Sequence, residues 1–182
     1  MAESIRLHEL EFVPYLEKPE LEQVVSELAA QLSSHYRGKC PLLVVVLNGA
    51  FMFAADLMKS ISLECEISFV KMSSYKGVQS TGQVNELIGL NADLKGKKVI
   101  LLEDIVDTGL TMDKILSLVE SYEPSTVKIC TLLYKPTAFK GKNEPHYVGF
   151  SIPDAFVVGY GLDYNERGRN LGSVYQIKND NN

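Results

Sequence analysis

The sequence predicts an α/β fold, in which a twisted, mainly parallel β-sheet is flanked by helices. Two observations support this. Continuous runs of Val, Ile and Leu, apolar on both faces, are typical of buried parallel strands. They alternate along the chain with segments of helical periodicity, which indicates right-handed crossovers. Because no repeat or Ser/Pro-rich linker divides the chain, we expect one domain over residues 1–182.

The first half of the chain contains a helix, a strand and a second helix. Apolar residues at helical spacing follow Pro19, and proline is favoured in the first turn of a helix. The apolar run Leu42–Leu47 predicts a strand that ends at Asn48–Gly49, and the composition of Ala50–Lys59 predicts a helix. The polar stretch Ser73–Glu86 has neither period, and at this length a loop is either a lid or disordered.

The second half repeats this alternation. Val99–Leu102 predicts a buried strand, and the residues around Ile115 predict a helix after it. Val127–Tyr134 predicts a third strand, and Phe156–Val158 a short fourth strand. In such sheets ligands bind beyond the carboxyl ends of the strands, so the residues just after each run are the candidates for function.

Composition and charge exclude several classes of protein. With 46% hydrophobic and 23% charged residues, the chain is typical of a globular protein and not of a disordered one. Its net charge of −5 argues against a dedicated nucleic-acid binder. The N-terminus lacks the apolar region of a signal peptide, and the longest apolar tract, Pro41–Ala55, is too short and interrupted to span a membrane. We therefore expect a cytoplasmic protein with no membrane partner.

The cysteines and histidines do not form a recognisable site. Three scattered thiols without a CxxC motif suit a reducing compartment and small buried side chains, at Cys40, Cys65 and Cys130. The three histidines match no motif, and we expect them at the surface, at His8, His35 and His146.

The most informative stretch is Val99–Met112, VILLEDIVDTGLTM. Its apolar strand ends in Glu103 and Asp104, and the turn Asp107–Thr111 leads into a helix. A glycine, free amides at a helix start and two hydroxyls suit a phosphate-binding turn. An ordinary helix cap would use Asp and Thr as well, and the turn alone would favour that simpler interpretation.

The three acids of this stretch favour a functional site. Adjacent carboxylates repel each other, so Glu103 and Asp104 make sense facing a diol or a hydrated metal ion. Asp107 would repel a phosphate beside it, which suggests that it exchanges a proton with a substrate. Phosphate, diol and metal together point to a phosphorylated ribose.

VILLEDIVDTGLTM resembles the phosphoribosyl-pyrophosphate signature of type I phosphoribosyltransferases, and the wider pattern is similar to the hypoxanthine-guanine phosphoribosyltransferases. Four further segments resemble that family in its own order, between about Leu43 and Arg169: Leu47–Gly49 with Phe51–Leu57, Ser74–Tyr75 with Ser80–Gly82, Leu132–Thr137, and Phe156–Glu166. The resemblance implies a type I phosphoribosyltransferase fold with a core over about residues 15–150 and a small hood, formed by the terminal segments, over the active site.

The same resemblance implies an enzyme of purine salvage. It would use Mg²⁺ to transfer the 5-phosphoribosyl group from phosphoribosyl pyrophosphate to N9 of hypoxanthine, and of guanine, giving IMP or GMP and pyrophosphate. It would do so as a homodimer or homotetramer. Two readings stay open beside it: a phosphoribosyltransferase-like regulator without catalysis, and an enzyme of the same class that prefers guanine or xanthine. A general nucleotide-binding module is a third, although the chain lacks the usual Gly-rich motifs.

Each implied role falls on a matching position. Asp107 would be the catalytic acid or base, in a phosphate-binding turn made of Asp107, Thr108, Gly109, Leu110 and Thr111. The ribose would lie on Glu103 and Asp104, and the base on Lys135, Phe156, Val157 and Asp163. The pyrophosphate would lie on Leu47, Asn48, Gly49 and Arg169, where the family tends to have a cis peptide bond. Ser74 and Tyr75 would form the catalytic loop, and Glu103, Asp104 and Asp163 would bind metal. Many family members carry lysine where this chain has Asn48 and Leu110.

Overall fold

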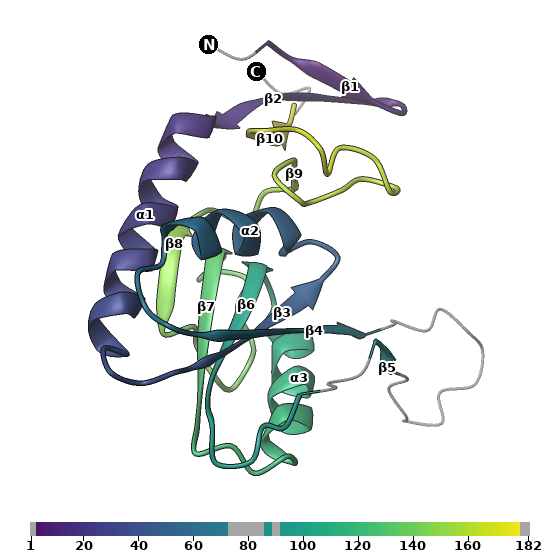
Figure 1. The fold of residues 1–182 in the computed structure, drawn as a ribbon. Helices are drawn as coiled ribbons and strands as arrows, with labels where there is room; N and C mark the ends of the chain where they lie inside the picture. The colour runs from purple at the N-terminus through teal and green to yellow at the C-terminus, as the bar shows by residue number, and fades with distance from the viewer. Residues whose placement is uncertain (1–2, 73–85, 89–91, 179–182) are drawn as a thin grey trace, which may run out of the picture.

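The computed structural model describes residues 3–72, 86–88 and 92–178. These residues form two β-sheets and three helices (Figure 1). The large sheet has the order β5–β4–β3–β6–β7–β8, with bounds β5 (Glu86–Ile88), β4 (Glu66–Met72), β3 (Leu42–Leu47), β6 (Lys98–Val106), β7 (Thr126–Tyr134) and β8 (Tyr147–Ser151). The small sheet has the order β1–β2–β10–β9, with bounds β1 (Ile5–Leu7), β2 (Leu10–Leu16), β10 (Val174–Ile177) and β9 (Val157–Val158). The helices are α1 (Lys18–His35), α2 (Phe51–Ser60) and α3 (Leu110–Glu120).

The large sheet confirms the predicted α/β fold. Strands β4, β3, β6, β7 and β8 run parallel to their neighbours, and β5 pairs antiparallel with β4. Helices α1 and α2 pack on one face of this sheet, and α3 packs on the other (Figure 1). The carboxyl ends of the parallel strands therefore lie together at one edge, between the two helical layers.

Alternation along each strand explains the continuous apolar runs. In β3, Leu43 and Val45 belong to the core beneath α1 and α2, whereas Leu42 and Val44 belong to the core beneath α3. Successive side chains of a strand point to opposite faces. A central strand covered by helices on both sides must therefore be apolar at every position, as the sequence of β3 is.

The small sheet joins the two ends of the chain. It is antiparallel throughout, and β2 pairs with β10, which places Phe12 opposite Ile177. Its core contains Phe12, Val158 and Tyr175. The sheet lies beyond one end of the large sheet, above α2, and both termini lie beside it (Figure 1).

One predicted strand belongs to a different sheet. Phe156–Val158 was expected as the fourth strand of the large sheet, and this expectation is wrong, because Val157 and Val158 pair antiparallel with β10. The position beside β7 is occupied by β8, which pairs parallel to it. Strand β8 has the sequence YVGFS, and this short mixed run lacks the aliphatic signature by which β3, β6 and β7 were predicted.

The remaining surface expectations have mixed outcomes. All three histidines are exposed, as predicted. The expectation of three buried thiols is wrong, because Cys130 is buried while Cys65 is only partly buried and Cys40 is exposed ahead of β3. Within the described part of the chain, no helix combines the length and apolar character needed to cross a membrane.

Candidate active site

A cavity of about 150 Å³ lies at the carboxyl end of β6. It is lined by the end of that strand and by the turn into α3, namely Glu103, Asp104, Ile105, Val106, Asp107, Thr108, Gly109, Thr111 and Met112. Gly109 is the N-cap of α3 with φ 78°, so the chain turns sharply there and the helix begins at Leu110. The predicted turn Asp107–Thr111 thus surrounds a hollow at the N-terminus of a helix, where unpaired amides favour anions.

The hydrogen-bonding capacity of the acid pair at the end of β6 is only partly satisfied within the described residues. Oε2 of Glu103 is buried there without a hydrogen-bond partner. Burial, and then the charge of Asp104, raise the pKa of Glu103 well above its ordinary value. Burial also raises the pKa of Asp104 to about 6, although the hydrogen bond from the Ile105 amide (2.9 Å to Oδ1) and the charge of Arg169 oppose it. Two such carboxyls are poised to receive a cation or hydroxyl donors.

Lys135 connects the strand after α3 to this cavity. Its side chain is only 7% exposed, and its Nζ lies 2.8 Å from Oδ2 of Asp107 and 3.3 Å from Oδ1 of Asp154. Its backbone amide donates to the carbonyl of Val106 (3.0 Å), which holds the end of β7 against the end of β6. A buried ammonium therefore lies between two carboxylates at the rim of the site.

The loop after β3 packs directly against the acid pair. The peptide bond Leu47–Asn48 is cis, as the resemblance implied. Gly49 lies so close to Asp104 that a Cβ atom at position 49 would collide with the Asp104 carboxylate. Likewise, a Cβ atom at position 161 would collide with the carbonyl oxygen of Gly49. Only glycine permits this approach of loop, strand and carboxylate.

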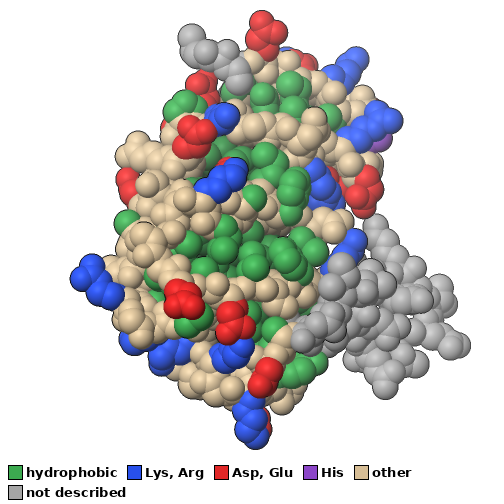
Figure 2. Space-filling model, viewed as in Figure 1, with side chains coloured by type: hydrophobic (Ala, Val, Ile, Leu, Met, Phe, Trp, Pro, Cys, Tyr) green, Lys and Arg blue, Asp and Glu red, His purple; other side chains and the backbone are tan. Residues whose placement is uncertain are grey.

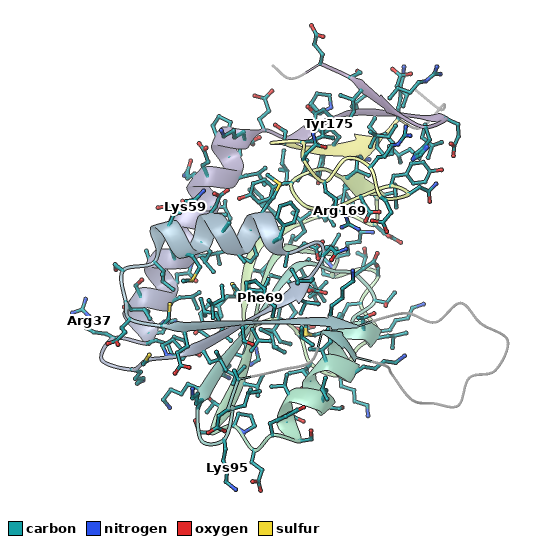
Figure 3. All side chains as sticks on the ribbon, turned by 45° about the vertical axis from the view of Figure 1, so that its right-hand side comes forward. Arg37, Lys59, Phe69, Lys95, Arg169 and Tyr175 are labelled. Atoms are coloured by element: carbon teal, nitrogen blue, oxygen red, sulfur yellow. The ribbon has the colours of Figure 1, made fainter. Side chains whose placement is uncertain are left out.

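Arg169 completes this side of the site. Its guanidinium lies 2.7 Å from Oδ1 of Asp163 and donates to the carbonyl of Gly161 at 2.9 Å. Figure 3 shows Arg169 where the loops of the small sheet meet the edge of the large sheet. Because Arg169 also lowers the pKa of Asp104 while Asp163 raises it, these three groups share one electrostatic environment.

Val157 begins strand β9 of the small sheet, and Phe156 directly precedes it. Val157 is buried, whereas the ring of Phe156 is 44% exposed and contacts Tyr164 edge-to-face, with centroids 5.9 Å apart. The remaining face of an exposed ring is available for stacking against a planar ligand.

The predicted site residues fall into adjoining groups. Glu103, Asp104, the turn 107–111 and Lys135 surround or border the cavity, and the loop 47–49 with Arg169 adjoins it through Asp104. Ser74 and Tyr75 lie outside the described residues. In the part of the chain that is described, no three His, Cys, Asp or Glu side chains are arranged to hold a metal ion. Any ion at these carboxylates would therefore take further ligands from substrate or water.

Sequence reasoning missed Asp154, the second carboxylate beside Lys135. It follows Pro153 at the end of β8, where aspartate is ordinary in a turn, so the sequence alone contained no signal for it.

Comparisons with known proteins agree with this geometry. Residues 14–165 match the family model described as "Phosphoribosyl transferase domain". The hypoxanthine-guanine phosphoribosyltransferase of Bacillus subtilis (strain 168) is 41% identical over 172 residues, covering 94% of this chain and 95% of that protein. The hypoxanthine phosphoribosyltransferase of Haemophilus influenzae is 44% identical over 157 residues, covering 84% and 88%.

Solved structures give the same result. A crystal structure of a hypoxanthine phosphoribosyltransferase from Staphylococcus aureus superposes with a TM-score of 0.85 at 41% identity, covering 91% of each chain. A parallel sheet with paired acids and a Thr-Gly turn at its carboxyl edge thus defines the general class, the phosphoribosyltransferases. The chain belongs to this family, in its hypoxanthine-guanine branch.

Proposed function

We propose that the chain transfers the 5-phosphoribosyl group of phosphoribosyl pyrophosphate to N9 of hypoxanthine or guanine. In this reaction N9 forms a bond to the anomeric carbon, the bond from that carbon to the pyrophosphate oxygen breaks, and pyrophosphate leaves with the electron pair. The base loses one proton. The observation that most supports this assignment is that one cavity is bordered by the paired acids, by the turn at the N-terminus of α3 and by the Lys135–Asp107 ion pair.

Asp107 and Lys135 would handle the base. A 6-oxopurine offers an acceptor at O6 and can present a proton at N7. Nζ of Lys135 would donate to O6, and the carboxylate of Asp107 would accept the N7 proton as N9 attacks. Because the two groups already lie 2.8 Å apart, one edge of a purine can reach both. The ring of Phe156 would stack on the base, and the backbone of Val157 would contact its edge.

The turn and the acid pair would hold the sugar phosphate. Amides and hydroxyls of residues 107–111 would bind the 5′-phosphate at the N-terminus of α3. The carboxylates of Glu103 and Asp104 would accept hydrogen bonds from the ribose hydroxyls, which would give the orphaned oxygen of Glu103 a partner.

The loop 47–49 and Arg169 would bind pyrophosphate. Arg169 offers the planar donor fork that matches phosphate oxygens, and it is held in place from one side by Gly161 and Asp163. We assign Ser74 and Tyr75 to the catalytic loop on the resemblance alone. The small sheet, built from the terminal segments, would be the hood above the site.

The acid residues fit a magnesium ion. Glu103, Asp104 and Asp163 supply hard oxygen ligands, and the buried, unpartnered oxygen of Glu103 is one that a cation would stabilise. Mg²⁺ bound there would neutralise charge on the pyrophosphate as it leaves. Because no three acidic side chains converge on one point within the described residues, a bound Mg²⁺ would take its remaining ligands from water and substrate oxygens.

We also propose that a second copy of the chain covers the apolar face beside α2. On β4, Ile67 and Phe69 are exposed although they share a sheet face with the buried residues Leu43 and Val45 of β3. Apolar side chains gather over α2 and β4 in Figure 2, and Phe69 lies at the centre of Figure 3. A contiguous apolar face of this kind marks a protein interface.

Measurement of pyrophosphate release tests the proposed function. The protein is incubated with phosphoribosyl pyrophosphate and Mg²⁺, and hypoxanthine, guanine, xanthine and adenine are offered separately. We expect release with hypoxanthine or guanine and none with adenine. Binding of phosphoribosyl pyrophosphate without turnover of any base would contradict the proposal and favour a regulatory protein, while turnover of xanthine above the others would correct the base preference.

A further inference from the structure

A buried tyrosine joins the small-sheet side of the site to α2. The hydroxyl of Tyr160, a residue only 3% exposed, donates to Oδ2 of Asp56 at 2.6 Å. Tyr160 follows β9, and Asp56 lies in the middle of α2. The two residues are 104 positions apart, so this contact connects elements that no strand pairing joins.

The chain around Tyr160 is tied closely to Arg169. The amide of Tyr160 donates to the carbonyl of Leu171, and the amide of Gly161 donates to the carbonyl of Arg169, both at 2.9 Å. The Arg169 guanidinium in turn donates to the Gly161 carbonyl. A displacement of Tyr160 would therefore move Arg169 with it.

Asp56 is anchored on the opposite side. Helix α2 begins at Phe51, immediately after the loop 47–49, and Asp56 accepts a second hydrogen bond from Lys59 at 2.9 Å. Burial pushes the pKa of Asp56 upwards, but the hydrogen bonds from Tyr160 and Lys59 outweigh it and leave the pKa below its ordinary value. The acceptor is thus a carboxylate, and hydrogen bonds to charged groups are stronger than those between neutral ones.

We infer that Tyr160 and Asp56 are positioning residues, which set the spacing between Arg169 and the loop 47–49 across the pyrophosphate. The inference rests on the proposed function. The Tyr160 hydroxyl and the Asp56 carboxylate are hydrogen-bonded to each other and neither residue lines the cavity at the end of β6, so we assign neither a contact with the reacting atoms. Their hydrogen bond instead connects the two halves of the pyrophosphate site, which also approach each other closely at Gly161 and Gly49.

Steady-state kinetics of Tyr160→Phe tests this inference. The variant keeps the ring in its buried place and removes only the hydroxyl. We expect the KM for phosphoribosyl pyrophosphate and the inhibition constant of pyrophosphate to rise about 3- to 10-fold, a part of what the loss of a hydrogen bond to a charged group costs. The KM for hypoxanthine should stay within about twofold, because the base contacts lie on other elements.

Three further variants separate positioning from general stability. Asp56→Asn keeps an acceptor for the Tyr160 hydroxyl and should restore most of the affinity that Asp56→Ala loses. The double variant of Tyr160→Phe with Asp56→Ala should be no weaker than either single variant, since both remove the same hydrogen bond. Tyr147→Phe is the matched control. It also removes a tyrosine hydroxyl, one that forms a hydrogen bond of 3.0 Å with Nδ1 of His35 on elements outside the site.

The outcomes distinguish the two proposals. If the wild-type protein shows no transfer, the proposed function fails and this inference fails with it. If the wild type is active but Tyr160→Phe leaves pyrophosphate affinity unchanged, only the inference is overturned. A parallel loss of hypoxanthine affinity, kcat and Tm in Tyr160→Phe would likewise overturn it, because that pattern indicates a structural role.

Discussion

At the scale of single residues, the ion pair of Lys135 with Asp107 has a consequence for base selection. In the described structure each group neutralises the other at 2.8 Å. A 6-oxopurine would replace that pair with two hydrogen bonds, one from Lys135 to its oxygen and one from its N7 proton to Asp107. Adenine would place an amino group against the ammonium, leaving two donors face to face. Discrimination would then follow from buried polar groups left without partners, which is a large effect.

Asp107→Asn is the sharpest test at this scale. The amide keeps the shape of the side chain but cannot accept a proton, so we expect kcat to fall about 10²- to 10⁴-fold. The KM for phosphoribosyl pyrophosphate should change little, because the proposed role of this carboxylate concerns the base. Asp154→Asn provides the control, since it removes the other carboxylate beside Lys135, 3.3 Å away and exposed. Equal losses in the two variants would contradict the distinct role of Asp107.

At the scale of elements, the buried acids at the carboxyl end of strand β6 lower the stability of the fold. Val99–Leu102 is a buried apolar run, whereas Glu103 and Asp104 carry pKa values raised chiefly by burial. An acid whose pKa is raised in the folded state destabilises the fold at pH values above that pKa, where its charge must stay buried. Such a cost at the end of a well-packed strand is typical of a binding site.

Asp104→Asn should therefore stabilise the ligand-free protein. With a folded-state pKa of about 6, the carboxylate costs roughly 2–3 kcal/mol at pH 8. We expect thermal unfolding at that pH, with EDTA present, to show a Tm higher by on the order of 5 °C. The gain should shrink as the pH falls from 6 and disappear below the ordinary pKa of 3.8, where Asp104 is protonated in both the folded and the unfolded state. A lower Tm for the variant at pH 8 would contradict this account of the acid pair.

The sequence predicted the elements that have a strong local signature. Helix α1, strand β3 and strand β6 with its turn into α3 all have long periodic or uniformly apolar runs, and the structure contains each of them. The placement of Phe156–Val158 failed because its partner, β10 (Val174–Ile177), is a strand of only four residues that was not predicted, and no local pattern indicates this pairing.

The site shows the same division. The acids and the turn of residues 103–111 are contiguous, so their motif could be read directly. The Tyr160–Asp56 hydrogen bond and the approach of Gly49 to Asp104 depend on how distant elements pack. Such contacts depend on tertiary structure, and no local pattern in a single sequence predicts them.

At the scale of the whole molecule, the uncovered face of β4 bears on assembly. Helices α1 and α2 cover neighbouring strands on this side but leave Ile67 and Phe69 exposed. A monomer would expose these side chains to water, at a cost of about 25 cal/mol per Å² of apolar surface. Pairing of two such faces would remove that cost.

Phe69→Glu should disrupt this assembly. We expect the wild type to elute as a dimer or larger species in size-exclusion chromatography with light scattering, and the variant to dissociate at the same concentration, because a charge would be buried in an apolar contact. Tyr122→Glu, at an exposed tyrosine just after α3, is the control and should leave the mass unchanged. A wild type that remains monomeric at high concentration would contradict the proposed interface.

The pairing of β2 with β10 determines when the molecule can be completed. Residues 10–16 precede every strand of the large sheet in the chain, whereas their partner strand, residues 174–177, follows all of them. All strands of the large sheet lie before residue 152, so they are synthesised before β10. During synthesis the nascent chain must therefore keep the apolar side of β2, including Phe12, without its final cover until β10 has been made.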